Sequence, residues 1–327
     1  MSVNPSMLSS RFSAAKKVQG IWKFLRVKAT GWPRLINLEV TKLCNAQCDF
    51  CPCWEIKDYP QLKDYGEVMR KFRPIVLSLN GGEPLLRKDF IDIIDQVRPW
   101  CTYLTVITHG GLLTEEKFRE LWDHGVDQVS ISRNYIDERH DEERKLPGLT
   151  GHFASLIPRL AKKGYDNLVF NTVIMDRNLD HIVPLARQAK EWGVKISFSS
   201  YTSLKNDKPE FRVREAQLER LRGVIKELLE LKRSQGNILT ADYYLKKVPD
   251  FFRQGFVEDC RAGLNFIQMT PDGYIKRCSE MPVMMHWTEY DPEKVEKPNP
   301  CNVCWLSCRG ETETPITPAR LWELVRH

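Results

Sequence analysis

Three cysteines stand close together early in the chain, as Cys44, Cys48 and Cys51. They follow an alternating stretch, Leu35 to Val40, that predicts a β-strand. Three thiolates on one short loop can ligate an iron–sulfur cluster, but they leave one iron of a four-iron cluster without a protein ligand. An open position is what a catalytic metal centre needs in order to bind a reactant. A zinc loop is the alternative at this stage, because short motifs are hypotheses.

A second group of cysteines lies near the other end of the chain. Its members are Cys260, Cys278, Cys301, Cys304 and Cys308. A Pro-Asp-Gly turn at 271–273 predicts a hairpin that brings Cys260 and Cys278 together. Four cysteines suit either an iron–sulfur cluster or a structural zinc ion. Because no secretory signal is visible, clustered cysteines indicate metal binding rather than disulfides.

Both cysteine groups must be positioned by a fold. The alternation of predicted strands and helices from Arg34 onward indicates which fold it is. The predicted strands are 34–41, 75–80, 102–108, 127–132, 167–174 and 194–200. The predicted helices lie near 64–73, 88–98, 114–124, 151–163, 179–192 and 214–234. Six strand–helix repeats predict an α/β fold with a parallel sheet, closed wholly or partly into a barrel. Such barrels carry function at the carboxyl ends of their strands, where the first cysteine loop lies.

Composition is that of an ordinary globular protein. The 327 residues are 42% apolar and 28% charged, and 49 basic against 43 acidic residues give a net charge of +6. This mild basic bias allows anionic partners, but we expect no nucleic acid. No apolar run is long enough to span a bilayer. We therefore expect a cytoplasmic protein, with association to a membrane surface left open.

The first 33 residues differ from the rest, because seven basic residues lie from Arg11 to Arg34 and no acidic residue precedes Glu39. Apolar residues recur at helical spacing: Leu8, Phe12, Ala15, Val18, Trp22 and Leu25. The segment 8–28 therefore predicts a basic amphipathic helix. It either contacts an anionic membrane surface or an acidic partner, or packs on the body of the protein with its lysines in solvent.

The pattern Cys44-x3-Cys48-x-Phe50-Cys51, placed after a first strand, resembles the signature of the radical S-adenosylmethionine (radical SAM) enzymes. Over roughly 34–310, the resemblance implies a partial (β/α)6 TIM-like barrel. It implies that the three cysteines bind a [4Fe–4S] cluster whose open iron chelates SAM. Reductive cleavage of SAM would then give a 5′-deoxyadenosyl radical that takes a hydrogen atom from the substrate.

Further motifs extend the resemblance. Gly81, Gly82, Glu83 and Pro84 follow the second strand, as does the family's element that binds the amino group of SAM; a tight turn is the alternative. Glycines let a ligand approach the backbone, and Glu83 is suited to accept a hydrogen bond from an ammonium group. The resemblance also implies that Ser132 and Asn171 help to hold SAM.

Four positions depart from the family pattern or carry no clear role. His109 stands where the family often has Asn, and we expect it to take a left-handed or turn conformation. Arg133 replaces an apolar residue, so a buried Arg133 would suit an anionic substrate group. His140 and Arg144 lie in a charged stretch that predicts a solvated loop.

The C-terminal cysteines resemble the SPASM and twitch extensions of radical SAM enzymes. This implies one auxiliary cluster, expected to be [4Fe–4S] and held by Cys260, Cys278, Cys301 and Cys304, with Cys308 as the rival for one place. The predicted organisation is an N-terminal segment 1–33, a barrel 34–235, an auxiliary-cluster domain 236–313 and a C-terminal helix 314–327.

The resemblance favours modification of a peptide or protein, with an electron donor such as flavodoxin or ferredoxin. One alternative is a lipid or another small molecule at a membrane surface. A second, from another class, is a non-catalytic zinc or iron–sulfur module. The sequence assigns no catalytic side chain, and it leaves the role of Cys53 open.

Overall fold

The computed structural model describes residues 14–56, 58–204, 206–315 and 317. Its sheet runs β6-β5-β4-β3-β2-β1-β7-β8-β9. The strands are β1 (Leu35–Thr41), β2 (Val76–Gly81), β3 (Tyr103–Thr108), β4 (Gln128–Ser132), β5 (Leu168–Ile174), β6 (Lys195–Ser200), β7 (Phe266–Met269), β8 (Tyr274–Lys276) and β9 (Val283–His286). Strands β1 to β6 are parallel, and β7 joins them parallel to β1. The predicted α/β barrel is confirmed, and each of its six strands matches the prediction to within one residue.

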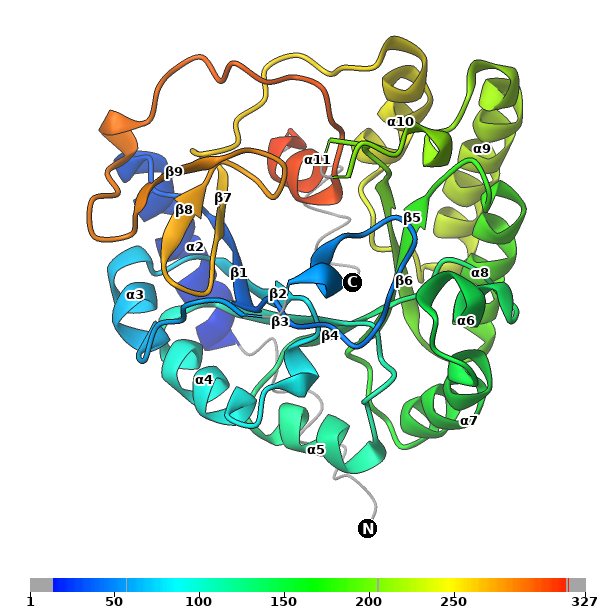
Figure 1. Ribbon diagram of the computed structural model, residues 1–327, viewed down its shortest axis with the longest axis horizontal. Coiled ribbons are helices and arrows are strands. Elements are labelled where there is room, and N and C mark those ends of the chain that lie inside the picture. The colour runs from blue at the N-terminus through cyan, green and yellow to red at the C-terminus, as the bar shows by residue number, and fades with distance from the viewer. Residues whose placement is uncertain (1–13, 57, 205, 316, 318–327) are drawn as a thin grey trace.

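Helices surround the ring of strands (Figure 1). They are α2 (Ala14–Thr30), α3 (Tyr65–Phe72), α4 (Phe90–Val97), α5 (Glu115–Asp123), α6 (Arg139–Arg144), α7 (Leu149–Lys162), α8 (Leu179–Glu191), α9 (Leu218–Gln235), α10 (Asp242–Gln254) and α11 (Ser307–Glu313). Local signals set several of their ends. Asp64 caps α3 by accepting from the N–H groups of Gly66 and Glu67 at 2.7 and 3.1 Å, and Gly236 ends α9 in a left-handed conformation.

The two faces of the sheet differ in character. Residues such as Ile36, Leu77 and Val106 face the helices and are fully buried in one apolar core. The residues between them face the inside of the ring and are largely polar. Strand register aligns Asn37, Ser78, Thr105 and Gln128 in one row across β1 to β4. The interior of the barrel is thus suited to polar molecules rather than to an apolar core.

The ring does not close by strand pairing among the described residues, because β6 and β7 are not neighbours in the sheet. Helix α11 contacts both of them across the opening. The predicted Pro-Asp-Gly hairpin is confirmed as β7 and β8, with Gly273 at φ 88°. The sheet is therefore continuous across the boundary that the sequence predicts near residue 235.

Helix α2 lies at the amino ends of the strands. Its Lys23 Nζ donates to the carbonyls of Trp100 and Pro74, at 2.8 and 3.3 Å, just before β3 and β2 begin. Arg26 Nη1 donates to the carbonyl of Phe72 at 3.2 Å. Helix α2 thus packs on the body through Lys23 and Arg26, with Lys28 exposed, while Val18, Ile21, Trp22 and Leu25 face solvent. Positions 8–13 and the helix expected near the C-terminus lie outside the described residues, apart from 314, 315 and 317.

Candidate functional site

The loop that carries Cys44, Cys48 and Cys51 follows the carboxyl end of β1, and Figure 1 shows it in blue, running across the ring of strands and back. Cys48 is buried, while the other two are half-buried. The N–H of Cys51 donates to the carbonyl of Cys48 at 3.2 Å, which folds the loop on itself. Burial raises the pKa of the Cys44 thiol to about 11. Ligation by a metal would deprotonate such thiols, since the thiolate is the ligand.

Helix α6 holds the loop from one side. Arg144 Nη1 lies 3.5 Å from Cys48 Sγ, and the Arg144 carbonyl accepts from the N–H of Gln47 at 3.0 Å. The prediction of a solvated loop is wrong here, because His140 is fully buried and Arg144 nearly so. Burial raises the pKa of Cys48, and the Arg144 guanidinium opposes that rise.

The segment after β6 holds the loop from the other side. Asn206 Nδ2 donates to the carbonyl of Phe50, and Lys208 Nζ donates to that of Asp49. The Phe50 ring packs edge-on against Phe211 with centroids 6.3 Å apart. The aromatic residue before the third cysteine therefore fastens the loop to the far side of the barrel mouth.

Gly81 and Gly82 are needed by the cysteine loop itself. A Cβ on Gly81 would lie 2.0 Å from the carbonyl oxygen of Thr41, and one on Gly82 would lie 2.0 Å from that of Leu43. Gly81 also has φ 138°, which favours glycine. The N–H groups of Gly82 and Glu83 donate to those same two carbonyls, at 2.9 and 2.7 Å. What approaches these glycines closely in the structure is the loop backbone.

Glu83 is fully buried, and its carboxylate is engaged within the chain. It accepts from the N–H of Leu85 at 3.0 Å, from Thr108 Oγ1 at 2.7 Å and from the N–H of His109 at 2.8 Å. The sequence led us to expect an ammonium partner. In the structure this carboxylate ties the end of β2 to the end of β3. Its binding of an ammonium group stays a prediction.

His109 extends this connection to the cysteine loop. The N–H of Gly111 donates to His109 Nδ1 at 3.0 Å, so Nε2 carries the proton and donates to Asn45 Oδ1 at 2.8 Å. Burial lowers the pKa of His109, which favours this neutral form. The expected left-handed conformation belongs to Gly110, at φ 80°, and not to His109.

Ser132 and Asn171 lie opposite each other on β4 and β5, and Ser197 on β6 continues the row. Ser197 Oγ is 3.4 Å from Asn171 Oδ1. All three face the inside of the ring, because the residues beside them belong to the apolar core. Our sequence analysis missed Ser197, although the alternation of Ile196, Ser197 and Phe198 contains the signal.

Arg133 points the other way, toward the helices. Its guanidinium lies 4.6, 5.1 and 5.7 Å from the ring centroids of Trp192, Phe170 and Phe153. Burial lowers its pKa to about 10. The expectation that Arg133 grips an anionic substrate group is wrong, because the side chain sits among aromatic rings outside the barrel.

All five C-terminal cysteines line one small cavity beside the opening between β6 and β7. Cys260 and Cys278 pack with Phe266 at the start of β7, and Cys308 joins them from α11. Cys304 is buried, whereas Cys301 is half-buried. Burial raises the pKa of Cys278 to about 11 and that of Cys304 to about 12. The donor set fits an iron–sulfur cluster chemically, since five thiols line the cavity and Arg309 is the one charged side chain among the described residues that line it.

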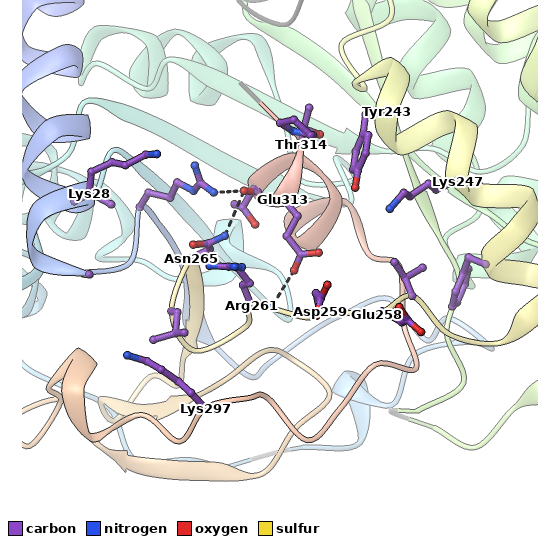
Figure 2. A pocket seen from close by; sticks show the side chains of 18 of the residues that line it. Lys28, Tyr243, Lys247, Glu258, Asp259, Arg261, Asn265, Lys297, Glu313 and Thr314 are labelled. Carbon is purple, nitrogen blue, oxygen red and sulfur yellow. Dashed lines mark hydrogen bonds between the residues drawn. The ribbon is translucent and has the colours of Figure 1, made fainter. Parts of the chain in front are cut away.

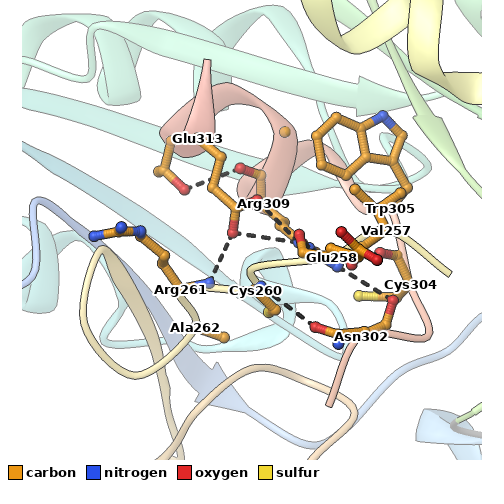
Figure 3. A network of polar contacts seen from close by, with 12 residues as sticks. Val257, Glu258, Cys260, Arg261, Ala262, Asn302, Cys304, Trp305, Arg309 and Glu313 are labelled. Atoms are coloured by element: carbon orange, nitrogen blue, oxygen red, sulfur yellow. Dashed lines mark hydrogen bonds and ion pairs between the residues drawn. The ribbon is translucent and has the colours of Figure 1, made fainter. Parts of the chain in front are cut away.

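A fully buried arginine braces this cysteine cavity (Figure 3). Arg309 pairs with Glu313 at 3.1 Å and donates to the carbonyl of Cys304 at 2.8 Å. It also donates to the carbonyls of Val257 and Glu258, both at 2.6 Å. Arg309 thereby joins the segment before Cys260 to the segment that holds Cys304.

Within the part of the chain that the structure describes, no three His, Cys, Asp or Glu side chains converge closely enough to hold one metal ion. A single zinc needs sulfur atoms about 2.3 Å from a common centre. A four-iron cluster makes a different demand, because each cysteine binds a different iron atom.

A separate, larger cavity of about 1220 Å³ lies at the amino end of the barrel. Its walls come from α2, α10 and the segments around residues 256–265 and 312–315. Figure 2 shows both signs of charge around it, with Lys28, Lys247 and Arg261 facing Glu258, Asp259 and Glu313. None of the predicted site residues lines this cavity.

The cysteine loop lies within the part of the chain that matches a known protein family. The model of the radical SAM superfamily matches residues 38–189, which span β1 to α8 and include the loop. The chain carries a radical SAM domain. Members of this superfamily use a [4Fe–4S] cluster and SAM, and the curated relatives described next are enzymes. The chain is thus a radical SAM enzyme rather than a non-catalytic module.

Two curated relatives align over most of the radical SAM chain. The AdoMet-dependent heme synthase of Methanosarcina barkeri is 26% identical over 283 residues, covering 79% of this chain and 80% of the relative. The PqqA peptide cyclase of Granulibacter bethesdensis is 23% identical over 323 residues, covering 85% and 82%.

Among solved structures, Streptococcus suis SuiB bound to the precursor peptide SuiA has a TM-score of 0.63 at 16% identity. The match covers 84% of this chain and 66% of the SuiB chain, so this chain spans just under two thirds of SuiB. At this identity the likeness shows the fold alone. No helix among the described residues is long and apolar enough to cross a membrane.

Proposed function

We propose that this radical SAM enzyme modifies a peptide or protein and uses an auxiliary iron–sulfur cluster to do so. The observation that carries the proposal is the second cysteine site: five cysteines around one cavity, apart from the loop at the barrel mouth. The relative named as a peptide cyclase and the fold shared with SuiB, solved with its precursor peptide, support a peptide substrate.

In this proposal Cys44, Cys48 and Cys51 hold the catalytic cluster. When bound, the cluster and SAM supply a radical that removes a hydrogen atom from the substrate. The residues of the chain itself hold the cysteine loop in position. Arg144 and His109 both hold the loop, at 3.5 Å from Cys48 Sγ and 2.8 Å from Asn45 Oδ1. Such rigidity matters because radical transfer requires the reacting atoms to be closely aligned.

The barrel interior would hold SAM and the reacting part of the substrate. The row of Ser132, Asn171 and Ser197 offers hydroxyl and amide groups on the inner face. The Gly81–Pro84 segment lies beside the cysteine loop, at the end of β2. The half-buried backbone of Gly81 and Gly82, rather than the engaged Glu83 carboxylate, is the part we assign to the amino group of SAM.

The auxiliary cluster would be held by four of the five C-terminal cysteines. Cys260, Cys278 and Cys308 pack together, and Cys304 is buried beside them. This packing favours Cys308 over Cys301 as the fourth ligand, which reverses the order of preference drawn from the sequence.

A small-molecule substrate is the second candidate. It is favoured by the likeness to AdoMet-dependent heme synthase, which has the higher identity of the two curated relatives described. The polar barrel interior suits this candidate as well as it suits a peptide side chain.

The proposal is tested on anaerobically reconstituted full-length protein with dithionite and SAM. We expect slow formation of 5′-deoxyadenosine, which is lost when Cys44, Cys48 and Cys51 are changed to Ala. A cell extract should then stimulate this rate, and prior digestion of the extract with proteinase should remove the stimulation. Stimulation that survives digestion would favour a small molecule. No 5′-deoxyadenosine from a protein with a full cluster would contradict the cysteine assignment.

A further inference from the structure

Helix α2 presents its apolar side to solvent. Val18, Ile21, Trp22 and Leu25 recur at the spacing of one helix face, and their exposed fractions are 53%, 60%, 69% and 52%. A surface helix normally turns such a stripe toward the core. This exposed stripe needs an explanation that the catalytic site does not supply.

The exposure follows from how the helix is attached. Lys23 and Arg26 point toward the body and donate to backbone carbonyls of Trp100, Pro74 and Phe72. The helix also passes close to the start of β3, since a Cβ on Gly20 would be in ordinary van der Waals contact with the methyl group of Thr102, at 3.8 Å. The body therefore binds the polar side of α2, and the apolar stripe is left facing outward.

The charge of this segment identifies what the stripe contacts. No acidic residue occurs before Glu39, and besides Lys23 and Arg26, which the body binds, the segment carries Arg11, Lys16, Lys17 and exposed Lys28. A second copy of the chain would bring two segments of like charge together. An acidic protein would need a larger patch, because stable protein interfaces use about 20–30 residues a side. An anionic membrane surface matches both the apolar stripe and the charge.

We propose that α2 docks the enzyme on an anionic membrane surface through Val18, Ile21, Trp22 and Leu25. The hydrogen bonds of Lys23 and Arg26 to the body lie at the amino ends of β2 and β3. The cysteine loop follows the carboxyl end of β1. A docked enzyme therefore keeps its catalytic mouth away from the lipid, so the surface recruits the protein while the substrate arrives from the aqueous side.

The test is co-sedimentation of the full-length protein with vesicles of phosphatidylcholine alone or with one quarter phosphatidylglycerol. We expect binding to the anionic vesicles that weakens as salt is raised. Replacing both Ile21 and Trp22 with Ser should weaken binding about a hundredfold or more, because burying each side chain contributes more than one factor of ten. Both side chains are exposed, so the variant should keep the wild-type circular dichroism and melting temperature.

A matched control lies at the mouth. Leu86, in the short helical turn Pro84–Leu86 after β2, is 38% exposed. Leu86→Ser should bind vesicles as the wild type does, and equal weakening by Leu86→Ser would mean that the mouth faces the membrane. Equal binding by wild type and the Ile21/Trp22 variant, or no binding at all, would overturn the proposal. So would a dimer in light scattering that the same variant abolishes. None of these measurements depends on the catalytic activity.

Discussion

Gly82 stands so close to Leu43 that any side chain would collide with it: a Cβ on Gly82 would lie 2.0 Å from the Leu43 carbonyl oxygen. The next residue bonds that oxygen, since the Glu83 N–H donates to it at 2.7 Å. The loop that carries the first three cysteines is thus pressed onto the end of β2. Its position depends on the absence of side chains at Gly81 and Gly82.

Gly82→Ala should therefore displace the cysteine loop. Overpacking of this kind costs about 1–3 kcal/mol, and we expect a lower melting temperature together with loss of the mouth cluster. The measurements are thermal unfolding and iron content after anaerobic reconstitution. Gly151→Ala in α7 is the control, since a Cβ there meets nothing within 4 Å. Full iron loading by Gly82→Ala would show that the loop tolerates the displacement.

Glu83→Gln should destabilise the protein even without cofactors. The amide would turn an N–H group toward a donor, either the N–H of His109 or the groups of Leu85 and Thr108. An unmade buried hydrogen bond costs about 1–3 kcal/mol. Thermal unfolding of the metal-free protein measures this, with exposed Glu116→Gln as the control. Unchanged stability combined with weaker SAM binding would contradict this expectation and support the ammonium-binding role predicted from the sequence.

Cys301 and Cys308 should behave differently when each is changed to Ala. Two four-iron clusters correspond to about eight irons per chain. Cys308→Ala should lose about half of them, while Cys301→Ala should keep nearly all, because Cys308 packs with Cys260 and Cys278. Cys101→Ala, in the apolar core, is the control. The opposite result would favour the ligand set expected from the sequence, and about one zinc per chain would favour a structural zinc.

Arg309→Met should release the segments that Arg309 braces. Glu313 would lose its partner in a largely buried position, which typically costs about 3–5 kcal/mol. We expect a lower melting temperature and fewer irons in the C-terminal site, seen as altered electron paramagnetic resonance of the auxiliary cluster. Arg253→Met, an exposed arginine on α10, should change neither. Normal cluster spectra in a destabilised Arg309→Met protein would limit the role of Arg309 to folding.

Local sequence patterns were sufficient to predict the strands of the barrel but not all of the helices around it. The strands from β1 to β6 were predictable because their buried residues recur with a short, regular period. Helix α6 was not, because Arg139–Arg144 is a run of charged and polar residues typical of a solvated loop. Its His140 and Arg144 are buried only because the barrel mouth and the cysteine loop cover them.

The sequence by itself determined the order of strands and helices, the spacing of the cysteines and the family resemblance. Each of these depends on residues that are near neighbours in the chain. The tertiary structure alone decided that Glu83 bonds Thr108 and His109, that Arg133 faces the helices and that the apolar stripe of α2 faces solvent. These contacts join residues far apart in the sequence. They depend on strand register and on which face of each element the rest of the molecule covers.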